Sequence, residues 1–292
     1  MSERLKAYLW MFFAYVCAVA AGAGVFLYGV MGDPLWDMLI ADAVGTAVIF
    51  LFSLLFRNSS FYDPYWSFIP LCIAWGWHWV LVSPDSAARS WLMQGLIALW
   101  GLRLTFNFLR GLTDLGHCDW RYRDLEAQFP RTFWLVSFSG IHYFPTLLVF
   151  LGLVPVYLAM AGNGGALNGW DLAGAIVTFG GAILEGVADQ QLVRFVRTNT
   201  EPERYINEGL WSVSRHPNYM GELMIWWGLA LFGYGVSGDW LWSFLGAVGM
   251  TILFVFISIP MIEKRMVRKR PGYVDQQKRV SVLIPWPPKK QP

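Results

Sequence analysis

Polar side chains are concentrated in residues 185–222 of a chain that is otherwise mostly apolar. Glu185 and Asp189 are four residues apart, so they share one face of a helix. An arginine-rich stretch follows, with Arg194, Arg197 and Arg204. Arginine forks match phosphate oxygens, and carboxylates accept hydrogen bonds from ribose hydroxyls. The segment therefore predicts a site for a phosphorylated ligand that carries hydroxyl groups, although a solvated loop of salt bridges explains the same composition.

The segment Arg215-His-Pro-Asn-Tyr-Met-Gly-Glu222 opens an apolar stretch. Pro217 suits the first turn of a helix, where a missing N–H group costs nothing. Asn218 and Glu222 then lie one turn apart on the same face, with Glu222 inside the bilayer. An ionisable group at that depth is costly and marks a functional site by default. The alternative is that Glu222 is merely hydrogen-bonded to another helix.

A second group of chemically useful residues is Tyr62-Asp-Pro-Tyr-Trp-Ser-Phe68. Asp63, Tyr62 and Tyr65 could hydrogen-bond a substrate carbonyl as it gains negative charge. Asp63 would need a raised pKa to donate a proton at neutral pH, and burial at a helix end would supply it. The alternative for Asp63 is a plain helix cap followed by a proline.

Three further features bear on a site. Arg103 and Asn107 share one face of a predicted span, either as ligand contacts or as structural partners. Asp42 lies inside another span and requires an internal partner that the sequence does not identify. Residues 119–124 predict a cytoplasmic cap over the site. The histidines, cysteines and acidic residues show no convincing metal-ligand spacing, so we expect no metal.

The elements that hold these residues must be membrane helices. Hydrophobic residues make up 56% of the 292 residues and charged residues 14%, whereas soluble domains are about 25% charged. Eight apolar stretches are long enough to cross roughly 30 Å of hydrocarbon. They comprise residues 7–30, 36–56, 66–83, 91–109, 133–161, 170–190, 218–234 and 240–260. We expect an all-α transmembrane bundle of about eight spans, forming a single domain over residues 1–292 with the lipid bilayer as its surroundings.

The basic residues test that count. With the N-terminus inside, the inner segments hold twenty of the 22 lysines and arginines. Arg89 lies in an outer loop and Arg103 within a span. This asymmetry follows the positive-inside rule, so we expect both termini and the site to face the cytoplasm. The net charge of +2 gives no reason to expect nucleic acid as a partner.

The segment 215–222 resembles the signature of the membrane steroid 5α-reductases and of the sterol C14 and C7 reductases. A looser version occurs in isoprenylcysteine and phospholipid methyltransferases. The resemblance covers roughly residues 185–285 and includes Glu208-Gly-Leu-Trp211 and a tail beginning at Tyr273. The whole chain is most similar to a bacterial branch of steroid 5α-reductase-like proteins, which shares stretches like residues 62–67 and 100–104. This likeness implies a bacterial inner-membrane protein.

The resemblance implies NADPH-dependent reduction of a carbon–carbon double bond, as in an enone, in a membrane-soluble lipid or steroid-like molecule. Region 185–285 would bind the cofactor, through Asp189, Arg194, Arg197, Arg204, His216, Asn218 and Glu222, with Arg103 and Tyr273. Asp63 matches the acidic member of the steroid enzymes' acid pair. Trp100, three residues before Arg103, stands where those enzymes have a tyrosine, which separates this chain from the steroid-reducing pattern.

Two other functions fit less of the sequence. One is an S-adenosylmethionine-dependent membrane methyltransferase. Glu263 and Tyr273 loosely match the C-terminal tail of that family, although Asn218 and the arginines favour a phosphorylated cofactor. The other is a transporter or structural membrane protein in which Glu222 and Asp42 line a polar path. The eight stretches show no evident inverted repeat, which makes a transporter less attractive.

Overall fold

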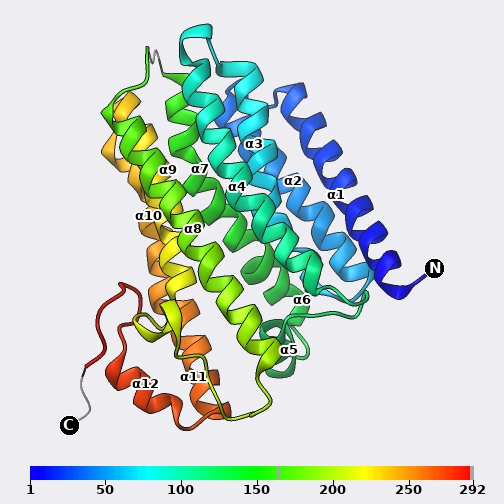
Figure 1. Ribbon diagram of the computed structural model, residues 1–292. Helices are drawn as coiled ribbons and strands as arrows, with labels where there is room; N and C mark the ends of the chain where they lie inside the picture. The colour runs from blue at the N-terminus through cyan, green and yellow to red at the C-terminus, as the bar shows by residue number, and fades with distance from the viewer. Residues whose placement is uncertain (163–164, 290–292) are drawn as a thin grey trace.

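The computed structural model describes residues 1–162 and 165–289, and within these ranges every regular element is helical. The predicted all-helical membrane protein is confirmed at this level. The long helices are α1 (Glu3–Tyr28), α2 (Pro34–Leu55), α3 (Tyr65–Leu81), α4 (Ala87–Gly111), α7 (Phe144–Ala161), α8 (Gly169–Thr198), α9 (Pro217–Ser237) and α10 (Trp240–Leu253). The shorter ones are α5 (Trp120–Gln128), α6 (Phe133–Val136), α11 (Ile259–Lys269) and α12 (Tyr273–Arg279). The long helices run side by side in one bundle (Figure 1).

Six helical stretches among the described residues are long and apolar enough to cross a membrane. They are Glu3–Tyr28, Pro34–Leu55, Pro84–Gly111, Phe133–Ala161, Gly169–Thr198 and Trp240–Lys269. The other two predicted stretches form α3, which has only 17 residues, and α9, which contains Glu222. Both helices pack within the bundle (Figure 1). The count of eight crossings stays a prediction.

Two of the membrane helices contain a π-helical turn. One turn, Ser137–Tyr143, joins α6 to α7, and the other, Phe254–Ser258, joins α10 to α11. Such turns accommodate an extra residue in a helix and often occur at functional positions. Pro145 lies in the first turn of α7, just after the π-helical turn. The final helix continues to Lys269, nine residues past the predicted end of the span.

Glycines bring α8 and α9 into backbone contact. A Cβ atom at Gly221 would lie 2.7 Å from the Glu185 backbone nitrogen, and one at Gly181 would lie 2.6 Å from the Gly221 carbonyl oxygen. Small residues allow this close approach between membrane helices. The contact sets Glu185 and Asp189 of α8 beside Asn218 and Glu222 of α9.

Both described ends of the chain lie at the same end of the bundle as α5, α11 and α12 (Figure 1). We call this the terminal end. Tyr8 donates to the Leu109 carbonyl at 2.9 Å, which ties the start of α1 to the end of α4. The Arg215 N–H donates to the Ser281 carbonyl at 2.8 Å, so the C-terminal segment lies against the start of α9. The polar segments singled out above therefore meet at one end.

Candidate functional site

A partly buried charged network lies where α4, α8 and α9 meet. Arg103 lies 2.7 Å from Asp189 and 2.5 Å from Glu185, measured between guanidinium nitrogen and carboxylate oxygen. Asn107 and Asn218 both donate to Asp189, at 3.3 and 3.4 Å. The sequence placed Glu185 with Asp189, and Arg103 with Asn107, each pair on one helical face. The structure joins these faces, with Arg103 between two carboxylates.

Glu222 lies deeper than this network and is 3% exposed. Its two carboxylate oxygens accept hydrogen bonds from the indole N–H groups of Trp100, at 2.7 Å, and Trp226, at 2.8 Å. Both tryptophans are fully buried. Trp100, the residue that departs from the steroid-enzyme pattern, is thus a partner of Glu222. The two indole hydrogen bonds explain how a carboxylate is tolerated at this depth, as in the alternative in which Glu222 is bonded to another helix. A contact between Glu222 and a cofactor stays a prediction.

Arg215 and His216 hold the C-terminal part of the chain against the bundle. The Arg215 guanidinium contacts Glu263 of α11 at 2.6 Å and donates to the carbonyls of Gln277 and Val280. His216 Nε2 lies 3.1 Å from the same carboxylate. These two residues of the motif therefore position α11 and the tail, and His216 also lines the cavity described next.

A cavity of about 300 Å³ opens beside the network at the terminal end, between α8, α9, α11 and α12. Its polar lining is provided by Arg215, His216, Asn218, Tyr219, Arg270, Tyr273 and Gln276. Asn218 connects the cavity to the network, since its amide also contacts Asp189. Three residues predicted to bind a cofactor, His216, Asn218 and Tyr273, are thereby brought to one cavity.

The remaining predicted arginines lie outside this cavity. Arg194, Arg197 and Arg204 are exposed at the end of α8 and in the loop after it. The Arg204 guanidinium lies 5.5 Å from the centre of the Phe195 ring, and Phe195 lines the cavity. Arg204 is therefore placed near the cavity, whereas the contact of Arg194 and Arg197 with a cofactor stays a prediction.

Asp63 contacts α5, the helix formed by the segment that was predicted to be a cap. Its side chain is 12% exposed. Tyr122 of α5 donates to it at 2.5 Å, and Arg121 lies 3.9 Å away. Burial raises the pKa of Asp63 from 3.8 to about 6, although the Arg121 charge and the Tyr122 hydrogen bond act in the opposite direction.

Tyr62 and Tyr65 point away from Asp63 into the bundle. The Tyr62 hydroxyl lies 2.8 Å from Thr146, which in turn lies 3.0 Å from Thr46. The Tyr65 hydroxyl donates to Asp42 at 3.5 Å. Thr46 is also hydrogen-bonded to Tyr65, so Tyr62 and Tyr65 belong to one hydrogen-bonded group, whereas Asp63 contacts Tyr122 and Arg121 of α5.

Reasoning from the sequence missed three partners. Trp226 lies one turn after Glu222, a spacing that the sequence does show. Tyr122 lies inside the predicted cap and was not assigned to Asp63. Tyr219, inside the 215–222 motif, lines the cavity, and its ring packs against His216 and Phe254.

These features define a polytopic helical membrane protein with a partly buried charged network near one end. The chain belongs to a family described as proteins of unknown function (DUF1295), which matches residues 49–280 and falls in the steroid 5α-reductase-like group. It is also similar to an uncharacterised protein of Schizosaccharomyces pombe, with 27% identity over 285 residues, covering 90% of this chain and 78% of the relative. No solved structure matches the chain. The family match includes both Asp63 and the 215–222 motif.

Proposed function

We propose that this protein is an NADPH-dependent reductase of a carbon–carbon double bond, as in an enone, in a lipid or steroid-like molecule taken from the membrane. The observation that carries the proposal is the network of Arg103, Glu185, Asp189 and Asn218, which borders a cavity at the basic end of the bundle. Membership of a family in the steroid 5α-reductase-like group supports the same reaction class.

The side chains at this end fit a phosphorylated dinucleotide. Among the residues that the structure describes, the Nε of Arg103 has no hydrogen-bond partner, so this donor is available to a ligand that reaches the network. Asn218, His216 and Tyr273 would hold the part of the dinucleotide inside the cavity of about 300 Å³. Arg197 and Arg204 would contact phosphates outside it, since guanidinium groups bind phosphate oxygens in pairs. The cofactor, when bound, supplies a hydride.

Asp63 would hold the proton in this reaction. With a pKa of about 6, it carries a proton in roughly a tenth of molecules at pH 7. Tyr122 and Arg121 fix its position from the cap. Tyr219 lines the cavity, so its phenol could orient the substrate oxygen.

The proposal includes an orientation. Eight crossings, with both termini and the cavity facing the cytoplasm of a bacterial inner membrane, would put the arginine-rich terminal end on the side that the positive-inside rule favours. The substrate would then enter from the bilayer, and the cofactor from the cytoplasm.

Calorimetric titration of the purified protein with NADPH tests the proposal. We expect Arg197→Ala or Arg204→Ala to weaken binding by about 10- to 100-fold, since each charge-assisted contact is worth ~1.5–3 kcal/mol. Arg131→Ala, which removes an exposed arginine between α5 and α6, is the matched control and should leave the affinity unchanged. Tight binding of S-adenosylmethionine with no binding of NADPH would overturn the proposal in favour of a methyltransferase.

A further inference from the structure

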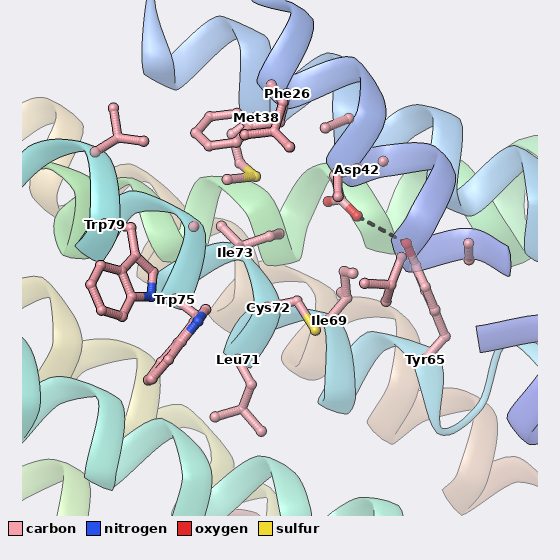
Figure 2. A pocket seen from close by; sticks show the side chains of 18 of the residues that line it. Phe26, Met38, Asp42, Tyr65, Ile69, Leu71, Cys72, Ile73, Trp75 and Trp79 are labelled. Atoms are coloured by element: carbon pink, nitrogen blue, oxygen red, sulfur yellow. Dashed lines mark hydrogen bonds between the residues drawn. The ribbon is translucent and has the colours of Figure 1, made fainter. Parts of the chain in front are cut away.

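A second and larger cavity lies between α1, α2 and α3, apart from the cavity beside the charged network, and its lining includes Asp42 and Tyr65. It has a volume of about 620 Å³, within the ~300–1,000 Å³ typical of small-molecule sites. Figure 2 shows the side chains around it, which are predominantly apolar and include Phe26, Met38, Ile69 and Trp75. The cavity differs from an ordinary packing defect in its size and in one polar feature.

That feature is Asp42, which lines the cavity and is only 2% exposed. One carboxylate oxygen accepts from the Tyr65 hydroxyl at 3.5 Å, drawn as a dashed line in Figure 2. The other oxygen, Oδ2, is buried and has no hydrogen-bond partner among the residues that the structure describes. An unsatisfied buried polar atom is costly, and in a lipid-embedded helix no water is available to relieve it. A ligand that reaches Asp42 through the cavity would relieve this cost.

The neighbouring residues keep this arrangement in place. A Cβ atom at Gly45 would lie 2.5 Å from the Tyr65 hydroxyl oxygen, so glycine at this position allows Tyr65 to reach Asp42. Gln94, another polar residue in the lining, already donates to Ser90 at 3.4 Å. The free carboxylate oxygen of Asp42 is therefore the point at which the cavity offers a ligand a strong hydrogen bond.

The cavity opens toward lipid and is remote from the cofactor cavity. Among its lining residues, Leu27, Trp79 and Val80 are 81%, 68% and 54% exposed, and such apolar side chains on a membrane helix face the hydrocarbon. Helices α2 and α8 both begin at the end of the bundle that is opposite the terminal end (Figure 1). Asp42 is eight residues from the start of α2, which is about 12 Å along the helix. Asp189 is twenty residues from the start of α8, which is about 30 Å along the helix. The two sites differ in depth by roughly 18 Å.

We propose that this cavity binds a neutral lipid alcohol: an apolar molecule of on the order of twenty carbon atoms whose single hydroxyl contacts Asp42. A hydroxyl fits because it can donate to an ionised carboxylate and accept from a protonated one. A cationic amine would add a second charge to be desolvated within the bilayer. The size follows from the volume, since a methylene group takes roughly the ~30 Å³ of a water molecule. The proposal stands whether or not the protein is a reductase.

Cys72 lines the cavity, so the rate at which its thiol is alkylated reports whether a ligand occupies the cavity. Lipid alcohol that only dissolves in the bilayer does not affect this measurement. The protein, with Cys17 and Cys118 replaced by serine, is placed in lipid nanodiscs and treated with the membrane-permeant N-ethylmaleimide. The labelling rate is measured by mass spectrometry as geranylgeraniol is added. Geranylgeranyl methyl ether, which has the same chain without the O–H donor, is the matched control ligand.

We expect geranylgeraniol to protect Cys72 at a mole fraction at least about tenfold lower than the ether, the effect of one hydrogen bond to a charged group. Asp42→Leu should make the two ligands equal, and Asp42→Asn should reduce the preference for the alcohol, because the amide oxygen accepts from Tyr65 and the NH₂ group left for the ligand donates equally to an alcohol or an ether. Thermal melting of each variant shows that it is folded. Absence of protection in the parent protein, equal protection by both ligands, or an unchanged preference in Asp42→Leu would overturn the proposal.

Discussion

The two indole hydrogen bonds to Glu222 allow one substitution to be worked out closely. Glu222→Gln keeps the size of the side chain but replaces one carboxylate oxygen with an NH₂ group. Only one of the indole N–H groups of Trp100 and Trp226 can then find an acceptor. The other would face a second donor in a site where Glu222 is 3% exposed and both tryptophans are fully buried.

The size of the effect follows from that lost acceptor. A buried donor left without a partner costs about 1–3 kcal/mol. Removing the charge of Glu222 also relieves its repulsion with Glu185, which offsets part of the cost. For a chain of this size, about 2–4 °C of melting temperature corresponds to each kcal/mol, so we expect a decrease of about 2 to 12 °C.

Thermal unfolding of the purified protein in one detergent measures this decrease. Glu126→Gln is the matched control, because Glu126 is exposed on α5, and its melting temperature should not change. A melting temperature of Glu222→Gln equal to or above that of the parent protein would refute the reasoning from the indole hydrogen bonds. Titration of the same folded variant with NADPH then separates the two roles: weaker binding supports a cofactor contact, and unchanged affinity leaves Glu222 a structural role alone.

Two further predictions concern the cap and the topology. The pKa of Asp63 in the folded protein, about 6, lies above the ordinary value of 3.8, so its stabilising contribution is complete below about pH 4 and is lost as pH rises through 6. Urea unfolding at several pH values should therefore show that the free energy of unfolding of Asp63→Asn rises by about 2–3 kcal/mol relative to the parent protein between pH 4 and 7. Tyr122→Phe should move the pH midpoint of the parent protein's loss of stability above 6, because it removes a hydrogen bond that lowers the pKa of Asp63. A difference between Asp63→Asn and the parent protein that does not depend on pH contradicts this account. Reporter fusions after Gly116 should be cytoplasmic and those after Gly238 periplasmic, and the reverse result for either one would remove a crossing.

Much of the architecture could be predicted from composition and spacing, because these depend on short-range properties of the chain. The length of an apolar stretch determines whether a helix can cross lipid, and all eight predicted stretches are helical in the structure. Spacing of four residues puts Glu185 beside Asp189, and Asn218 beside Glu222, on any regular helix. Gly221 allows a close approach in any packing, and only the structure shows that α8 takes that place.

The tertiary structure alone decided which faces meet. Trp100 and Glu222 are separated by 122 positions in the chain, and their contact depends on how α4 and α9 are rotated and tilted when they pack. The same holds for Asp63 with Tyr122, for Arg215 with Glu263, and for Asp42 with Tyr65. The periodicity of one helix specifies its polar face but carries no information about the helix opposite. Close packing of small side chains between helices settles that pairing, and with it which carboxylates are satisfied and which oxygen of Asp42 is left for a ligand.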